Sequence, residues 1–532
     1  MQPSQNFFSR ECIRYVICAA LMACLVSAAA AVGFSQKRNE ADRESLKDAI
    51  GLTRDNELKK SEAILHKLVK ADPDNAKART ELAFNLTKQR RFVEAYETIL
   101  SVLDKDKKDS RALSVLGALL LASGRIRDAR AIIYTALDLR RGEHLAWASL
   151  GMLDYYDNDV DQAINSLKQA IYLAPREPDY YFSLAQASVR ADRYKDAAVA
   201  YDRFLSVSGA MDVDRRERIR GLVSFLRYLD ARPSLYDASG AGRTTVKFEL
   251  VTNRPIIEVR VNDYSKPLRF VIDTGSGMTV ISNKTAELLG MKEVARGGNA
   301  RGVGGDGKFP IIYGFVNEIK MGDVSVHNIP VYIRDVQSRQ QIDGYLGLAV
   351  ISKFFATIDY GTKTLTLSKE DSSEAFSKEN ADHILPLRLT PSGFLSGEVG
   401  VAGIETNLNF IVDTAASVSV ISDNIAAAEA IKKYLSDQRY RVIGAAGEVV
   451  DAPTFLLPRV TFGQNVRAPL VAVALDLDVI NESSGFDQAG ILGGNFLRNY
   501  RVAFDFKRAR VRLTPIASET GENTGKQQLN ED

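Results

Sequence analysis

Residues 270–282 read FVIDTGSGMTVIS, and residues 410–422 read FIVDTAASVSVIS. The two stretches align without a gap, and Asp413 follows Asp273 by 140 positions. In each stretch an apolar, strand-like run leads into Asp-Thr, a small residue and a turn. One chain therefore carries the same acidic turn twice, and the interpretation of the surrounding sequence starts from this duplication.

The regions downstream of the two acidic turns also repeat. Residues 343–367 read DGYLGLAVISKFFATIDYGTKTLTL, and residues 489–513 read AGILGGNFLRNYRVAFDFKRARVRL. Each combines two apolar residues and a Gly with a short helix-like stretch and two strand-like runs around a turn. Gly347 and Gly493 lie 146 positions apart, close to the spacing of the acidic turns. The second half of the chain is thus predicted to consist of two duplicated lobes built mainly of β-strands.

Composition sets the limits of the two lobes. Residues 233–243 contain Gly, Ser and Asp and are typical of a linker, so lobe 1 is assigned to residues 244–367. The charged, Ser-rich stretch 368–383 is a bridge, and lobe 2 covers residues 384–515. The polar residues 516–532 are predicted to form a disordered tail.

The composition also restricts the chemistry available to the chain. Its 532 residues are 45% hydrophobic and 26% charged, and the net charge of +2 gives no basic field of the kind that nucleic acid attracts. The three Cys all precede residue 25, so neither a disulfide nor a thiol nucleophile is expected in the body of the protein. The four His are scattered and lack the spacing of a metal site. We expect no metal, no cofactor and no nucleic-acid partner.

Two acidic turns that face each other would bring the carboxylates of Asp273 and Asp413 together. Like charges at such a distance cannot both ionise readily, so the pair would share one proton. The ionised member can take a proton from a water molecule, and the protonated member can polarise a peptide carbonyl. The pattern predicts general acid–base hydrolysis that needs neither a metal nor a covalent intermediate.

Residues 244–515 resemble the aspartic proteases of the retropepsin-like group. The resemblance rests on Asp-Thr-Gly-Ser at residues 273–276 and on the apolar-apolar-Gly motifs at 345–347 and 491–493. It implies a two-lobed fold and an endopeptidase that cleaves a polypeptide substrate. Retropepsins build their site from two copies of one chain, and here the second lobe would supply the partner within the same chain.

The resemblance also assigns roles within the two turns. Asp273 and Asp413 become the catalytic dyad. Ser276 would bond the outer oxygen of Asp273, unless it is only a local cap of its turn. The residues expected to support the dyad are Thr274, Gly275, Ser276 and Thr414.

A Gly-rich stretch follows each acidic turn. Residues 301–311 read RGVGGDGKFPI, and residues 442–450 read VIGAAGEVV. In the family, a Gly-rich hairpin at this place closes over the substrate as a flap, and the alternative is a solvent-exposed Gly turn. The expected flap and substrate-binding residues are Gly302, Gly304, Gly305 and Gly307.

The second turn departs from the motif at Ala415, where the first turn has Gly275. A methyl group there would be strained if the turn needs a conformation open only to Gly, or it would crowd the partner turn. Three hypotheses follow. In the first, both lobes share one dyad and the protein is an endopeptidase. In the second, lobe 2 is a scaffold, and activity is weak, absent, or needs a dimer of first lobes. In the third, the whole fold is a non-catalytic peptide-binding module.

A helical repeat precedes the lobes. Two columns recur every 34 positions: Leu82, Leu116, Leu150 and Leu184, and Ala95, Ala129, Ala163 and Ala197. The pattern is similar to the tetratricopeptide repeat, in which small residues let two helices cross closely. The sequence predicts an all-α solenoid over residues 41–232, with a degenerate helix at 57–69 before the repeats and a capping helix at 215–229. Such a solenoid is expected to bind a protein partner or the substrate, and the alternative is a spacer or self-association module.

The N-terminus is typical of an export signal, which we assign to residues 1–36. Arg10 and Arg14 precede an uncharged stretch that ends in small residues, as signal peptidase requires. Its apolar length equally suits an uncleaved membrane anchor through residues 15–34, and the sequence LMAC ending at Cys24 allows a third alternative, lipidation. In all three cases we expect an exported, periplasmic protein, soluble or anchored to the inner membrane.

Overall fold

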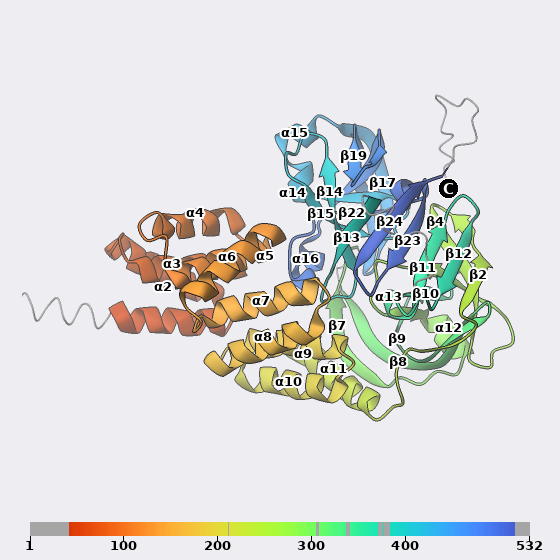
Figure 1. Cartoon of the computed structure of the whole chain (residues 1–532), viewed down its shortest axis with the longest axis horizontal. Helices are drawn as coiled ribbons and strands as arrows, with labels where there is room; N and C mark the ends of the chain where they lie inside the picture. Colours follow the sequence, from red (N-terminus) through yellow and green to blue (C-terminus); the bar gives the residue numbers. More distant parts are fainter. Residues whose placement is uncertain are drawn as a thin grey trace, which may run out of the picture. The chain divides into compact units, whose positions relative to one another are not determined.

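The computed structural model of the chain describes residues 42–210, 212–304, 308–336, 341–370, 376 and 383–516. A series of helices is followed by a mainly-β region, which confirms the predicted fold class (Figure 1). The chain divides into two compact units, one up to Leu119 and one from Leu120 onward. The predicted export segment lies outside the described residues. Within the described part, no helix is long and apolar enough to cross a membrane.

The helices keep the 34-residue period. The first unit contains a helix at residues 42–54 followed by α2 (Leu58–Ala71), α3 (Ala76–Lys88) and α4 (Phe92–Leu103), and α5 (Ser110–Ala122) runs across the division at Leu119. The start of α2 precedes that of α4 by 34 residues, and a further helix comes before it. The stretch predicted as a degenerate helix at 57–69 is therefore the second helix of an additional pair.

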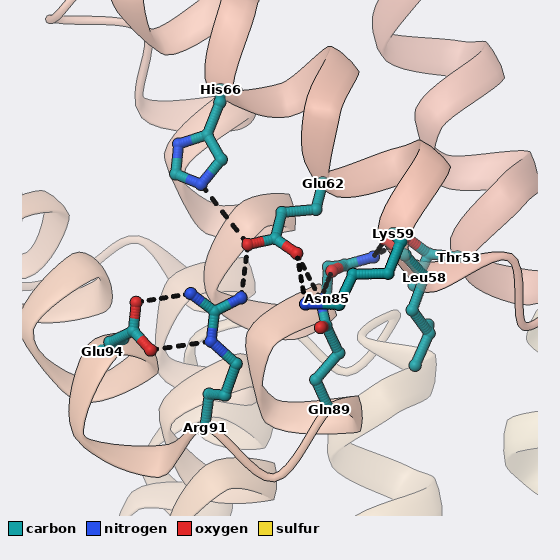
Figure 2. Close-up of polar contacts among 9 residues, drawn as sticks. All are labelled: Thr53, Leu58, Lys59, Glu62, His66, Asn85, Gln89, Arg91 and Glu94. Atoms are coloured by element: carbon teal, nitrogen blue, oxygen red, sulfur yellow. Dashed lines mark hydrogen bonds and ion pairs between the residues drawn. The ribbon is translucent and has the colours of Figure 1, made fainter.

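A polar cluster around Glu62 ties the first helices together (Figure 2). Glu62 on α2 accepts hydrogen bonds from Arg91, at the start of α4, and from Gln89 Nε2 at 3.0 Å. Burial would raise the pKa of the Glu62 carboxyl, but the hydrogen bonds from Arg91, Gln89 and Lys59 outweigh it and lower that pKa to about 2. Arg91 also pairs with Glu94, one turn along α4. The cluster therefore holds an ionised carboxylate between neighbouring helices.

The second unit begins with the later repeats. The helices of this part are α6 (Ile126–Leu139), α7 (His144–Tyr156), α8 (Val160–Leu173), α9 (Pro178–Arg190), α10 (Tyr194–Val207) and α11 (Val213–Asp230). The small residues of the repeat lie where helices cross, because Ala129, Ala163 and Ala197 are all 0% exposed. A Cβ atom at Gly151 would lie only 2.7 Å from Leu167 Cγ, so α7 and α8 could not approach as they do with a larger residue.

Lobe 1 is a nine-stranded sheet in the order β1-β9-β6-β10-β5-β4-β8-β7, with β3 paired to β4. Its strands are β1 (Asp237–Gly240), β3 (Glu249–Val251), β4 (Arg254–Val261), β5 (Leu268–Ile272), β6 (Thr279–Ser282), β7 (Ala295–Arg301), β8 (Lys308–Met321), β9 (Val324–Arg334) and β10 (Gly344–Leu346). Two short helices complete it, α12 (Asn283–Leu288) and α13 (Leu348–Ile351).

Lobe 2 repeats the central part of this sheet. Its strands are β13 (Ile384–Leu389), β14 (Leu395–Val401), β15 (Leu408–Val412), β16 (Ser419–Ser422), β17 (Leu435–Gly444), β18 (Gly447–Leu457), β19 (Val460–Phe462), β20 (Asn465–Arg467), β21 (Leu470–Leu475) and β22 (Gly490–Leu492). Its helices are α14 (Asp423–Ala426), α15 (Glu429–Lys432), α16 (Asp478–Ser484) and α17 (Gly494–Leu497). In both lobes the strand before the acidic turn pairs in parallel with the strand of the apolar-apolar-Gly motif, β5 with β10 and β15 with β22.

Strands from both halves form a sheet that joins the lobes. It runs β2 (Arg243–Lys247), β12 (Thr364–Ser368), β11 (Phe355–Asp359), β23 (Tyr500–Asp505), β24 (Arg510–Pro515) and β13. β11 pairs with β23, the corresponding strand of the second copy, and the buried side chains of both lobes belong to one hydrophobic core. The two lobes are therefore held together by main-chain pairing as well as by apolar packing.

Two segments differ from the sequence-based expectation. The predicted linker contains strand β1, in which Asp237 pairs with His327 of β9, and Leu235 before it is buried. The predicted capping helix, α11, packs against lobe 1 instead of ending the stack with a free polar face. A Cβ atom at Gly221 would lie 2.0 Å from the carbonyl oxygen of Arg296 in β7. Both segments are fixed by tertiary contacts that local composition does not reveal.

Candidate active site

The two acidic turns are joined by reciprocal hydrogen bonds between their threonines. Thr274 Oγ1 donates to the carbonyl oxygen of Val412 at 2.7 Å, and Thr414 Oγ1 donates to that of Ile272 at 2.6 Å. The same hydroxyls accept from the opposite main chain, because Thr414 N lies 3.1 Å from Thr274 Oγ1 and Thr274 N lies 3.2 Å from Thr414 Oγ1. Both threonines are 0% exposed. Each hydroxyl is thus satisfied by the other lobe, and the two turns are locked in one relative position.

Each aspartate is anchored by its own turn and by the motif strand of its lobe. Asp273 N donates to the Leu346 carbonyl oxygen at 3.0 Å, and the Asp273 carboxylate accepts from Gly275 N at 2.9 Å. Asp413 N donates to the Leu492 carbonyl oxygen at 3.1 Å. The predicted apolar-apolar-Gly motifs therefore lie directly behind the acidic turns and fix their main chain.

Gly275 shows how closely the turns approach. A Cβ atom built on Gly275 would lie 2.5 Å from Cγ of Asp413, inside the contact distance of any real side chain. The φ angle of Gly275 is not in the left-handed region, so the glycine is needed here for space and not for its backbone conformation. The carboxylate of Asp413 consequently lies against the turn that carries Asp273. We refer to this pair of carboxyl groups as the dyad.

Ala415 fits the second turn without the strain considered from the sequence. Its φ angle is also outside the left-handed region, and Ala415 packs against the lobe 1 cluster formed by Ile256, Val271 and Ile342. The amides of Ala415 and Ala416 donate to Asp413 Oδ1 at 2.7 Å and 3.2 Å. Replacing Gly by Ala therefore leaves the Asp413 carboxylate in place and hydrogen-bonded.

Of the two roles considered for the Ser276 hydroxyl, the structure shows the local cap and not the bond to Asp273. Its Oγ donates to the Met278 carbonyl oxygen at 2.8 Å, so it caps its own turn instead of bonding the outer oxygen of Asp273. The Ser276 main chain still belongs to the site, because its amide helps to stabilise the Asp273 carboxylate and its carbonyl accepts from Leu348 N at 2.8 Å.

Burial and mutual repulsion control the ionisation of the dyad. Asp273 is only 7% exposed, and burial together with the charge of Asp413 raises the pKa of Asp273 to about 8. Burial also raises the pKa of Asp413, against the opposing effect of its two amide hydrogen bonds and of Arg254. Two such groups titrate as a pair that retains one proton well above the ordinary pKa of an aspartate.

The Gly-rich stretches are hairpins whose tips touch. Ala446 N, in the β17–β18 hairpin, donates to the Val303 carbonyl oxygen of the β7–β8 hairpin at 3.0 Å. A Cβ atom at Gly304, which has φ +96°, would lie 2.0 Å from the Gly447 carbonyl oxygen. At Gly302 it would lie 3.2 Å from Ala445 Cβ. Gly305 and Gly307 lie outside the described residues.

Three residues near the dyad were not singled out by sequence reasoning. Arg254 opens β4 and acts electrostatically on Asp413, while Arg334 closes β9 and acts on Asp273. Tyr345, inside the recognised motif, lies in the field of both aspartates and both arginines. Comparing the two lobes position by position would have found them, because the matching residues of lobe 2 are not polar. In the described part of the chain, no three His, Cys, Asp or Glu side chains are grouped as a metal site.

Family models match both regions of the chain. A model described as aspartyl protease matches residues 257–350 and 397–496, which are the central parts of the two lobes. Two tetratricopeptide repeat models match residues 52–119 and 148–209. No protein in the curated set matches the chain.

Solved structures similar to the chain include PilF of Pseudomonas aeruginosa, at 20% identity and a TM-score of 0.27, covering 36% of this chain and 86% of that one. A thermophilic TPR protein of Thermus thermophilus has 19% identity and a TM-score of 0.30, with 34% and 98% covered. YrrB, a TPR protein with an unusual peptide-binding site, has 18% identity and a TM-score of 0.21, with 32% and 91% covered. The chain thus combines tetratricopeptide repeats with a retropepsin-like aspartyl protease region that is present as two lobes.

Proposed function

We propose that the protein is an aspartic endopeptidase whose dyad, Asp273 and Asp413, is formed within a single chain. The observation that carries this proposal is the reciprocal bonding of Thr274 and Thr414, each to a main-chain carbonyl of the opposite lobe. These bonds hold the two carboxyl groups together without a second protein molecule. The match of both lobes to the aspartyl protease model supports the proposal.

The electrostatics suggest a division of labour within the dyad. We take Asp273, whose pKa is raised by burial and by the charge of Asp413, as the member that holds the shared proton, and Asp413, whose Oδ1 accepts hydrogen bonds from two amides, as the ionised member. Asp413 takes a proton from water as the water oxygen bonds to the peptide carbonyl carbon, while Asp273 gives its proton to the carbonyl oxygen. The product of this step is a gem-diol. When its C–N bond breaks, the leaving nitrogen takes up the proton held by Asp413, and a hydroxyl group of the gem-diol returns a proton to Asp273. The dyad is thereby restored.

The hairpins would bind the main chain of the substrate. Their touching tips, Val303 and Gly304 on one side and Ala446 and Gly447 on the other, would have to separate before a polypeptide could reach the dyad. An extended peptide between dyad and hairpins would then meet main-chain donors and acceptors from both lobes, as in other strand-addition modes of recognition. Gly302 and Gly304 would permit that close approach.

The tetratricopeptide repeats would hold the protein substrate or a partner that delivers it. Repeats of this kind generally act as protein-interaction modules, which supports a protein partner. We further propose that the protein acts outside the cytoplasmic membrane, because the sequence of residues 1–36 is typical of an export signal. Cell fractionation with and without residues 1–36 tests this location, and retention in the cytoplasm with the segment present would contradict it.

The proposed activity is tested by replacing each aspartate in the full-length protein. Asp273→Asn and Asp413→Asn are each expected to lower the rate of cleavage of an unfolded protein by about 1,000-fold or more. Asp451→Asn is the matched control, because Asp451 is exposed and its φ of +70° is one that Asn also tolerates. Loss with Asp273→Asn alone would make lobe 2 a scaffold. Binding without cleavage by the folded wild type would favour the non-catalytic module.

A further inference from the structure

The duplication allows each position beside the dyad to be compared with its counterpart in the other lobe. Tyr345 pairs with Val271 on the strand that leads to Asp273. Ile491 pairs in the same way with Ile411, which lies 140 positions after Val271. Tyr345 of lobe 1 therefore corresponds to Ile491 of lobe 2.

The same comparison applies to Arg334. It pairs with Ser282 at the end of β6. In lobe 2 the equivalent Ser422, again 140 positions later, pairs with Leu475. A cationic side chain in lobe 1 thus takes the place of an aliphatic one in lobe 2.

Arg254 follows the same pattern. In lobe 1, Ile256 pairs with Val271, and in lobe 2 Ser396 pairs with Ile411. Arg254, two residues before Ile256, therefore corresponds to the residue two positions before Ser396. That residue is Phe394, which is buried. Lobe 1 carries Arg254, Arg334 and Tyr345 where lobe 2 carries Phe394, Leu475 and Ile491.

The three polar residues of lobe 1 act on one region beside the dyad. The Arg334 guanidinium lies 6.0 Å from the centre of the Tyr345 ring. Arg254 follows the tight turn at Asn253, and Asn253 Nδ2 donates to the Ser417 carbonyl oxygen in the turn of Asp413 at 3.0 Å. Both arginines influence the pKa of the Tyr345 hydroxyl, which burial raises. The arginines and the tyrosine consequently form one cationic cluster at the dyad.

Neither arginine forms a hydrogen bond or an ion pair with a carboxylate of the described residues. The side chain of Arg254 has no hydrogen-bond or ion-pair partner among the described residues, and its Nε is buried without one. Arg334 Nη1 donates only to the Ala445 carbonyl oxygen, at 3.2 Å, and its Nε is likewise buried and unpaired. Buried Asp505, by contrast, is paired with Arg508 and Arg510. Both arginine side chains are half-buried, and their two positive charges exceed the single negative charge of a dyad that shares a proton, so the cluster is suited to an incoming anion.

We propose that the protein cleaves beside an acidic residue: the cluster Arg254, Arg334 and Tyr345 binds a substrate carboxylate next to the scissile bond, and the lobe 2 positions bind an apolar residue across it. This inference rests on the proposed protease function. Two positive charges face a dyad that carries one negative charge when it shares a proton. One substrate carboxylate neutralises the remaining charge, and the Arg fork and the phenol offer it hydrogen-bond donors.

A competing role for the arginines is to adjust the ionisation of the dyad. The groups that face the dyad and the cluster are Asp273, Asp413, Arg254, Arg334 and Tyr345. If adjustment were the whole role, removing Arg254 would raise the pKa of Asp413 and shift the alkaline limb of the pH–activity profile to higher pH. The preference between substrates would stay unchanged. If Arg254 binds substrate, its removal changes preference between acidic and neutral peptides at every pH.

The test uses matched peptides that carry Glu or Gln on one side of the scissile bond and Leu on the other. Each peptide is also made with these two residues exchanged. Each is supplied as a cleavable peptide and as a reduced-amide analogue that cannot be cleaved. With the full-length protein, we expect the better Glu analogue to bind about tenfold to hundredfold more tightly than its Gln counterpart, the effect of one charge-assisted hydrogen bond. Arg254→Gln should reduce this preference to within about threefold. Arg260→Gln, on the same strand but exposed, should preserve it.

The two readouts separate the inference from the proposed function. Tighter binding of the Glu analogue that is lost with Arg254→Gln supports the inference even if the parent peptide is not cleaved, and absent cleavage would then count against protease activity alone. Equal or undetectable binding of Glu and Gln analogues overturns the inference, whether or not peptides are cleaved. A preference that survives in Arg254→Gln and in Arg334→Gln also overturns it.

Discussion

At the scale of single residues, the two acidic turns differ most at one aligned pair, Gly275 and Ala415. Only the first position lacks room for a methyl group, because a Cβ atom there would lie 2.5 Å from Asp413 Cγ. At the second, the methyl group packs beside lobe 1 side chains. Replacing Gly275 by Ala should therefore impair the dyad, whereas replacing Ala415 by Gly should change it little.

Gly275→Ala is expected to lower the rate of peptide cleavage about 100-fold, because the new methyl group displaces the Asp413 carboxylate from the dyad. Ala415→Gly, the matched control, should stay within a few-fold of wild type. Steady-state kinetics with one peptide measures both. Equal losses in the two variants would show that the turns are less asymmetric than described here.

The buried acid Asp273 makes a separate prediction about stability. Its folded-state pKa of about 8 exceeds the ordinary value of 3.8 for an aspartate, so between these pH values the folded state holds a proton that the unfolded state has lost. Folding stability contributed by this group therefore falls as the pH rises through that window. Asp273→Asn removes the effect and should raise the free energy of unfolding at pH 7 by on the order of 1–3 kcal/mol.

Denaturant unfolding at pH 7 and at pH 4 measures this difference, which should nearly vanish at the lower pH. Asp451→Asn, an exposed site, serves as the control and should show no pH-dependent gain. A stability gain at pH 4 as large as that at pH 7 would mean that the Asp273 carboxyl is not held protonated in the folded protein.

The sequence anticipated much of the site at this scale, but not all of it. The aligned DT turns and the paired apolar-apolar-Gly motifs predicted a dyad, and the structure joins those turns through Thr274 and Thr414. The sequence could not decide between the two roles of the Ser276 hydroxyl, since a turn serine has several partners within reach. Arg254 and Arg334 lie outside the recognised motifs, and it is the strand register that places them beside the dyad.

At the scale of elements, helix α11 joins the repeats to lobe 1. Phe225 of α11 stacks on Tyr313 of β8 with ring centres 4.3 Å apart, and Arg218 Nη1 donates to the Asn299 carbonyl oxygen at 3.2 Å. Strands β7 and β8 continue into the Gly302–Gly304 hairpin. One helix therefore supports the base of a hairpin that we propose to be a flap.

Gly221 makes this contact possible and gives it a sharp test. In an ordinary helix interior, Gly→Ala stabilises by about 0.5–1 kcal/mol. At Gly221 the added Cβ would lie 2.0 Å from the Arg296 carbonyl oxygen, so Gly221→Ala should instead destabilise, by about 1–3 kcal/mol. Gly51→Ala is the helical control with the expected opposite sign, because its Cβ would meet only the tip of Arg54 at 3.7 Å. Denaturant unfolding measures both, and a stabilising Gly221→Ala would mean that α11 does not pack on β7.

Elements with strong internal repetition were predictable, and elements defined by tertiary pairing were not. The 34-residue period located the helices because each crossing demands a small residue, as at Ala129 and Ala163. Strand β1 was predicted as linker, since four residues with Gly and Ser carry little strand preference and pair only because β9 offers an edge. The first helix pair was underestimated because its apolar columns are degenerate.

At the scale of the second unit, the later repeats contact both lobes. Besides the α11 contacts with lobe 1, Tyr156 of α7 packs edge-on against Phe486 of lobe 2 at 4.9 Å between ring centres. Asp157 pairs with Arg388 of β13. A partner bound to these repeats would therefore be held beside the protease lobes and not on a separate, loosely tethered module.

A mixing experiment tests whether one chain contains one complete dyad. Full-length Asp273→Asn and Asp413→Asn proteins are assayed separately, mixed in equal amounts, and compared with wild type over a 100-fold dilution series at constant substrate. If each chain holds its own dyad, the mixture remains inactive and the activity of wild type per molecule does not change with dilution. Recovery of activity on mixing, or wild-type activity that falls steeply on dilution, would contradict it by showing that two chains build the site together.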